Sequence, residues 1–219
     1  MLVHTKKLSA YTVYLIYSGA SALFLGTIST VNLVYQIQVA HLTPLQLVLV
    51  GTVLETVCFF CQVPTGVLAD VYSRRLAVIV GIFAIGAGFV LEGSIPSFPF
   101  ILLAQLLWGL GATLTDGAEQ AWITGELGEN AVGHAFIRST QVGLVGGLLG
   151  AFVGVSLASI RLNLPVVLGG ASMAILAVFL LLFMPEKGFQ STPKEERPSW
   201  GEMGNTLRTS LRLVQLGGR

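Results

Sequence analysis

Charge is scarce in this sequence. Asp, Glu, Lys and Arg make up 11% of its 219 residues, whereas a soluble domain carries about 25%. Hydrophobic residues account for 53% of the chain, and the mean hydropathy is +0.79. This deficit excludes a soluble domain and indicates a membrane protein. The net charge of +1 gives no indication of a nucleic-acid partner, because the basic residues do not gather on one face of a soluble domain.

Cysteine and histidine are also few. The two cysteines, Cys58 and Cys61, lie inside one apolar run, which excludes a disulfide framework and favours thiols that only pack. No histidine or second cysteine pair lies near them, so we expect no metal site. The histidines at 4, 41 and 134 lie in turns or near a terminus and form no catalytic triad. The sequence has no Walker loop either, so it indicates neither an enzyme nor a cofactor.

Long apolar segments dominate the rest. A helix needs roughly 17–25 residues to cross a hydrocarbon core of ~30 Å. We predict six spans, over residues 11–34, 45–69, 76–91, 98–122, 135–158 and 165–184. The segments are apolar all round, which excludes the alternating strands of a membrane barrel. The first segment is too long for the core of a signal peptide. The predicted fold is therefore an all-α membrane protein, with one bundle of six transmembrane helices in residues 1–184.

The distribution of lysine and arginine predicts the orientation. With the N-terminus inside, only Arg161 of the 12 basic residues lies outside. The inner ones are Lys6, Lys7, Arg74, Arg75, Arg138, Lys187, Lys194, Arg197, Arg208, Arg212 and Arg219. The positive-inside rule then places both termini in the cytoplasm. We expect a multi-pass protein of the cell inner membrane.

The composition changes after Met184. Residues 185–199 are polar, charged and rich in proline, which is typical of a linker. Residues 200–216 place leucines between arginines and predict a basic amphipathic helix on the membrane surface. The same pattern also fits the start of a helical connector to something further along. We interpret residues 185–219 as a cytoplasmic linker that leads onward.

One short turn between two spans carries a motif. Residues 66–75 read Gly-Val-Leu-Ala-Asp-Val-Tyr-Ser-Arg-Arg. This stretch resembles the loop between the second and third helices of the major facilitator superfamily, whose pattern is Gly-x-Leu-Ala-Asp-x-x-Gly-Arg-Arg/Lys. The match covers Gly66, Asp70, Arg74 and Arg75 together with the Leu-Ala pair between them. Ser73 stands where the family has a glycine.

The resemblance implies roles for these residues. Gly66 would let a neighbouring helix approach closely. Asp70, Arg74 and Arg75 would latch the cytoplasmic ends of the helices together in the outward-open state. The family places an acid at the cytoplasmic end of span four, and Glu126 fits that position as a partner of Arg74. The alternative is that the two arginines are only topology signals, although that role would require neither Asp70 nor Gly66.

The resemblance extends over essentially the whole chain, but over only about half of a family member. It therefore implies an N-terminal half with a missing C-terminal six-helix half as its partner. Residues 116–123 resemble a stretch of bacterial members described as efflux proteins. Two departures weaken an antiporter assignment: Gln105 replaces an arginine linked to proton transfer, and the glycine-rich fifth span lacks the Gly-Pro pair of drug/proton antiporters.

Acids at membrane depth need an explanation, because each costs on the order of 2.5–3.5 kcal/mol. Glu55 in span two is either a solute or proton contact in a central cavity or a hydrogen-bond partner of a neighbouring helix. Asp116 and Glu119 lie three residues apart and would share a helix face. We expect Arg138 of span five to pair with Glu119. One arginine cannot neutralise three acids, so Glu55 or Asp116 is expected to be neutral or to face a wet cavity.

Neutral polar residues add to these candidates. Span one carries Asn32 and Gln36 near its outer end, with Gln38 just beyond. The function we expect is secondary active transport of a small solute by alternating access, with ion-coupled efflux as the first hypothesis. The alternatives are uptake of a small polar solute, or a truncated half-bundle that only associates with a partner in the lipid bilayer.

Overall fold

The computed structural model describes residues 8–189 of the chain. These residues belong to a unit that ends at Phe189. The predicted amphipathic helix over 200–216, and the predicted linker beyond residue 189, lie outside the described residues.

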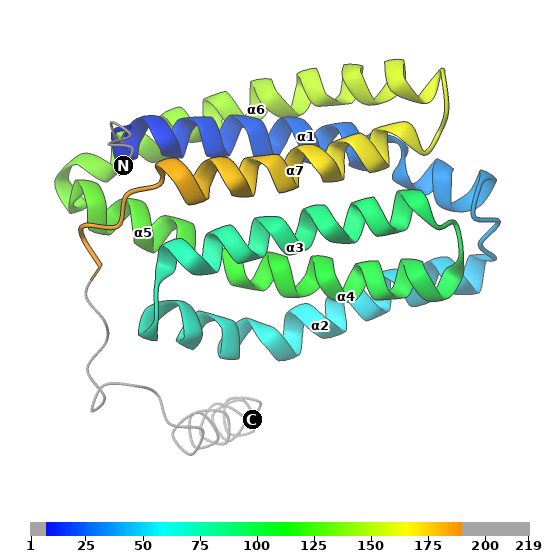
Figure 1. The fold of residues 1–219 in the computed structure, drawn as a ribbon, viewed down its shortest axis with the longest axis horizontal. Coiled ribbons are helices and arrows are strands. Elements are labelled where there is room, and N and C mark those ends of the chain that lie inside the picture. Colours follow the sequence, from blue (N-terminus) through cyan, green and yellow to red (C-terminus); the bar gives the residue numbers. More distant parts are fainter. Residues whose placement is uncertain (1–7, 190–219) are drawn as a thin grey trace, which may run out of the picture. The chain divides into compact units, whose positions relative to one another are not determined.

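Seven helices and no strand make up the described residues (Figure 1). They are α1 (Ala10–Gln38), α2 (Pro44–Val71), α3 (Arg74–Ser94), α4 (Phe98–Thr115), α5 (Ala118–Leu127), α6 (Glu129–Ala158) and α7 (Leu164–Phe183). Taken together, α4 and α5 count as one candidate span, so six stretches are long and apolar enough to cross a membrane. The all-α fold with six spans is thereby confirmed.

Local sequence signals start several of these helices. The side chains of Ser9, Thr43 and Ser73 each accept a hydrogen bond from a backbone N–H in the first turn of the helix that follows. Such caps satisfy amides that have no partner inside the helix. At α2 the cap is reciprocal with Gln46, and Pro44 occupies the first turn, as predicted.

The span predicted over 98–122 is wrong in one respect, because the helix breaks inside it. α4 ends at Thr115, and α5 starts at Ala118. Gly117 between them has φ of +77°, a backbone conformation that glycine adopts without the steric cost other residues pay. The expectation that Asp116 and Glu119 share a helix face is wrong for the same reason: Asp116 caps α4, whereas Glu119 lies in the first turn of α5.

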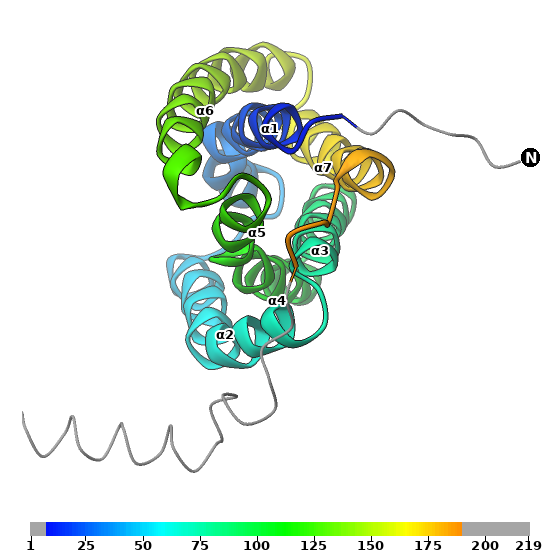
Figure 2. The same ribbon diagram turned by 90° about the vertical axis from the view of Figure 1, so that its left-hand side faces the viewer.

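The helices pack in the order α6, α1, α7, α3, α4, α2. Figure 1 shows α6, α1 and α7 side by side and α3, α4 and α2 beside them, with α3 against α7 joining the two groups. Figure 2 looks onto one end of the bundle, where α5 lies between the two groups. We call this the Arg74 end, since α3 begins there at Arg74. The opposite end, where α3 finishes, is the Glu92 end.

Glycine lets two neighbouring helices of one group, α1 and α6, touch backbone to backbone. On α6, Gly146, Gly150 and Gly154 lie against the carbonyl oxygens of Gly19, Leu23 and Thr27 of α1. A methyl group at any of the three would overlap one of those oxygens. Lipid tails are as apolar as the helices, so no hydrophobic driving force holds two helices together in a membrane. Small residues at the seam allow the close dispersion contacts that hold them instead. These three glycines therefore form a close-packed seam between α1 and α6.

We expect Gly150→Ala to destabilise the bundle by about 1–3 kcal/mol, because its methyl group would overpack the contact with Leu23. Gly133→Ala is the matched control, since nothing lies within 4 Å of a Cβ at that position of the same helix. Thermal unfolding of both variants in detergent measures the difference. Equal midpoints for the two variants would contradict the tight α1–α6 seam.

Candidate functional site

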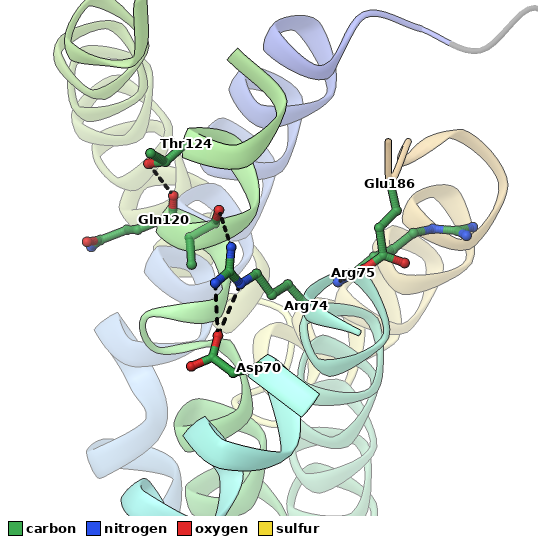
Figure 3. Close-up of polar contacts among 7 residues, drawn as sticks. Asp70, Arg74, Arg75, Gln120, Thr124 and Glu186 are labelled. Carbon is green, nitrogen blue, oxygen red and sulfur yellow. Dashed lines mark hydrogen bonds and ion pairs between the residues drawn. The ribbon is translucent and has the colours of Figure 1, made fainter. Parts of the chain in front are cut away.

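The Arg74 side chain joins three elements at one end of the bundle (Figure 3). Its guanidinium forms an ion pair with Asp70 at the end of α2, with an N···O distance of 3.1 Å. It also donates a hydrogen bond of 3.1 Å to the backbone carbonyl of Ala121 on α5. Both side chains are partly exposed, so the geometric link between α2, α3 and α5 matters more than the Coulomb energy of the pair.

Arg75 and Ser73 reach a different neighbour, the segment that leaves α7. The Ser73 hydroxyl donates to the Glu186 carboxylate at 2.8 Å, and the backbone N–H of Arg75 donates to the same carboxylate at 3.2 Å. The Arg75 guanidinium donates to the carbonyl of Leu181 at 2.6 Å. Glu186 thus places an anion at the N-terminus of α3, where the helix dipole favours negative charge.

Glu126 does not pair with Arg74, which corrects the expectation from the sequence. Its carboxylate instead accepts hydrogen bonds from the backbone N–H groups of Lys187 and Gly188. Nearby, the indole N–H of Trp122 donates to the carbonyl of Pro185 at 2.7 Å. We call residues 185–188 the strap, because they tie α5 to α3 beneath the end of α7. Almost every residue has a backbone N–H group, so the sequence gives no signal that those of Lys187 and Gly188 bind Glu126 in place of Arg74.

The expected close approach at Gly66 is also absent from the described residues. Nothing lies within 4 Å of a Cβ built on Gly66 or on Gly51. Both glycines belong to α2, in which only Val50 and Ala69 are buried. One side of α2 is therefore not covered by any other helix that the structure describes.

Glu55 lies on this uncovered side of α2. It is exposed, as are Thr52 and Gln62 of the same helix. The described residues offer Glu55 no ion pair or hydrogen bond to a neighbouring span, so the helix-contact interpretation finds no support within this bundle. A carboxyl at the middle of a span is costly against lipid, which indicates that water or another protein surface faces it.

A cavity of about 450 Å³ opens between α1, α5 and α6. Its walls carry aromatic rings, hydroxyl groups and one carboxyl, that of Glu119. The lining includes Tyr14, Tyr17, Ser18, Ser21, Ser139 and Thr140. Tyr17 and Glu119 both line this cavity. The break at Gly117 matters here, because it lets the first turn of α5 present Glu119 to α1.

The predicted pair between Glu119 and Arg138 is not formed. Arg138 is exposed, and its guanidinium donates to Gln141 on its own helix at 3.2 Å. Its neighbour Ser139 is the buried residue that faces α1, where its carbonyl accepts from the Ser18 hydroxyl at 2.9 Å. Because one residue turns a helix by about 100°, Arg138 points away from the cavity that contains Glu119. Asp116, at the break, is likewise exposed.

A second polar cluster, at the Glu92 end, contains a carboxyl that sequence reasoning missed. The predicted candidate Gln36 is buried and donates from its amide to Glu92 at 2.7 Å, and Gln105 donates to the same carboxyl at 3.2 Å. Asn32 also lies beside it. Glu92 escaped notice because span three was predicted to end at Leu91, whereas α3 continues to Ser94. Extending that span by one turn would have found it.

Comparison with known proteins identifies the family. A profile of the Major Facilitator Superfamily matches residues 10–216. The chain belongs to the Major Facilitator Superfamily. This superfamily consists of transporters and not of enzymes.

Two relatives in the Major Facilitator Superfamily are both about twice as long as this chain or longer. The MFS-type transporter YxaM of Bacillus subtilis is 24% identical over 208 residues, which cover 93% of this chain and 50% of YxaM. The multidrug resistance protein MdtG of Escherichia coli is 30% identical over 152 residues, which cover 69% of this chain and 37% of MdtG. This chain thus spans half or less of the length of these relatives.

A solved structure shares the fold. The nucleoside transporter NupG matches with a TM-score of 0.78 and 18% sequence identity, over 95% of this chain and 53% of NupG. At this identity the likeness concerns the helix arrangement of the superfamily alone. Against the superfamily motif, Ser73 gains two contacts that a glycine could not make: it caps α3 and donates to Glu186.

In this superfamily member we expect Glu126→Ala to loosen the strap. A hydrogen bond to a charged acceptor contributes about 1.5–3 kcal/mol, so the amides of Lys187 and Gly188 should exchange roughly tenfold to a hundredfold faster. Hydrogen exchange read by mass spectrometry on the purified chain measures this. Glu129→Ala is the control, because Glu129 is exposed and accepts no side-chain hydrogen bond in the described part of the chain. Unchanged exchange in Glu126→Ala would show that the strap is held by other contacts.

Proposed function

We propose that this chain is the first half of a secondary active transporter that exports a small amphipathic solute by alternating access, coupled to an ion gradient. The observation that carries this proposal is the cavity between α1, α5 and α6. Its volume of about 450 Å³ falls within the ~300–1,000 Å³ of known small-molecule sites. A solute bound there would lie between helices that can change their packing, which is what transport requires.

The cavity wall suggests the class of solute. Tyr14, Tyr17 and Phe136 supply aromatic faces, and Glu119 supplies the one carboxyl among the lining residues that the structure describes. Aromatic faces attract cations, and a carboxyl adds opposite charge. An amphipathic cation suits this wall. The name of the relative MdtG, a multidrug resistance protein, supports efflux as the direction.

The Arg74 end supplies the two-state element of the proposal. Asp70, Arg74 and Ala121 link α2, α3 and α5, while Arg75 and Glu186 link α3 to the strap. These contacts hold the helix ends together in one state and must break in the other. A solute shifts such an equilibrium only by its difference in affinity for the two states. Gly66, Asp70, Arg74, Arg75 and Glu126 are in this proposal the latch, with Glu126 acting through the strap.

A second six-helix half completes the proposed transporter. It would cover the exposed side of α2, where Glu55 lies, and turn Glu55 and Asp116 towards a central water-filled passage. The basic side chains Arg74, Arg75 and Lys187 gather at the Arg74 end of the bundle, whereas Arg161 lies in the loop at the Glu92 end. By the positive-inside rule the Arg74 end faces the cytoplasm, with both termini inside and the bundle in the cell inner membrane.

One observation favours uptake of a polar solute as a second candidate. Four hydroxyl groups, from Ser18, Ser21, Ser139 and Thr140, line the same cavity. Hydroxyl groups bind sugar-like or amide-like solutes by hydrogen bonds, and a site built on such bonds rejects analogues that lack the matching group.

We expect Glu119→Gln to lower the export of a fluorescent amphipathic cation roughly tenfold or more, because a charge-assisted contact in a partly buried site contributes on the order of 1.5–3 kcal/mol. The assay uses the protein expressed from its complete gene, in inverted membrane vesicles with an imposed proton gradient. Glu129→Gln is the matched control on the exposed start of α6.

The other results decide between the candidates. Export of the cation with no effect of Glu119→Gln would remove Glu119 from the site. Uptake of a neutral polar solute, without movement of the cation, would favour the second candidate. An intact mass in the native membrane of 23.2 kDa, with no transport of either probe, would leave a half-bundle that only associates with a partner.

A further inference from the structure

Glu92 is a fully enclosed carboxyl near the end of α3. Its exposed fraction is 0%. One carboxyl oxygen accepts from the amide of Gln36 on α1 at 2.7 Å, and the other accepts from the amide of Gln105 on α4 at 3.2 Å. The Tyr35 hydroxyl donates to the backbone carbonyl of Glu92 at 2.6 Å. Three helices therefore converge on a single acid.

No cation is among the groups that act on Glu92 in the described residues, although the exposed Arg161 lies in the loop at this end of the bundle. Of the elements packed against α3, α1 brings only one titratable group to the cluster, the Tyr35 phenol, and α4 and α7 contain no acid, base or histidine. α2 and α5 do carry titratable side chains, but none of them is among the groups that act on Glu92. These side chains are Glu55, Cys58, Cys61, Asp70, Glu119 and Glu126.

A buried acid without a cation is costly in its ionised form. The effective penalty for burying one ion is several kcal/mol, and neutral amides offset only part of it. A protonated carboxyl avoids that penalty, but its O–H then needs an acceptor. The cluster contains such an atom: Oδ1 of Asn32 is buried and has no hydrogen-bond partner among the described residues. Asn32 lies beside the Glu92 carboxyl.

We propose that Glu92 is a proton-binding site whose loading and release accompany the transport cycle. The role of Glu92 in coupling rests on the proposed function, whereas its ability to bind a proton does not. In this proposal the enclosed carboxyl carries the proton, and the unpaired Oδ1 of Asn32 is the candidate acceptor for its O–H. When the Glu92 ends of α1, α3 and α4 separate, the proton leaves to water and a solvated carboxylate remains. No other bond forms or breaks.

The position of the site gives it a distinct part in the cycle. Glu119 and the solute cavity lie at the Arg74 end, and Glu92 lies at the other end of α3. Under the proposed orientation, Glu92 meets the outer solution when that end opens. Its neutral form can be enclosed without the penalty of burying a charge, so proton loading favours the closed outer end. A proton from outside would thus help to turn the protein inward.

Infrared difference spectroscopy on the purified chain in lipid nanodiscs tests the proton site without any solute. Raising the pH should remove a carboxylic C=O band from the wild-type spectrum. In Glu92→Gln, whose amide can donate to Asn32 as the protonated acid does, that loss should be missing. Glu129→Gln, an exposed position, should keep it. If the wild type and Glu92→Gln lose the same bands, Glu92 does not titrate and the proposal is overturned.

A second variant keeps the test decisive if Glu92→Gln does not fold. Gln36→Leu removes the donor to one oxygen of the ionised form, so the band should persist to higher pH than in the wild type. A band that disappears at an unchanged pH would overturn the proposal. Failure of transport in the vesicle assay leaves both infrared results standing, so the proton site and the proposed function can fail separately.

Discussion

An apolar bundle offers no water to the polar groups inside it, so each of them must be satisfied by another part of the protein. This constraint accounts for the contacts of two enclosed polar groups described above. Glu92 collects amides from two other helices, and Trp122 uses the carbonyl of Pro185. A partner missing from either of these sites would leave a buried group unpaired, at a cost of about 1–3 kcal/mol.

The same constraint makes the segment after α7 important to α3 and α5. The strap carries backbone amides and a carbonyl that α5 needs, together with Glu186, which the first turn of α3 needs. The motif between α2 and α3 is therefore more than a two-helix contact. Any movement that separates α3 from α5 has to release the strap as well as the Arg74 guanidinium.

Because of the break at Gly117 and the uncovered side of α2, the acids of this bundle differ in how far they are buried. Glu119 is partly buried in a cavity of mixed polarity, whereas Asp116 and Glu55 are exposed on this bundle. Glu92 is enclosed at the other end. Acids in such different surroundings are suited to different roles, because burial and available donors determine which protonation state is favoured.

Much of this protein follows from its sequence alone. Scarce charge and six long apolar segments were sufficient to predict the all-α membrane fold, because lipid tolerates few alternatives to a helical span. The motif over residues 66–75 was sufficient to indicate the superfamily. Tertiary structure alone decided the partners. Glu126 binds backbone amides of the strap and Arg138 turns to Gln141, since a one-residue step on a helix redirects a side chain and backbone donors leave no mark in a sequence. Glu92 became visible only when α3 proved longer than its apolar run, with amides distant in sequence meeting around it.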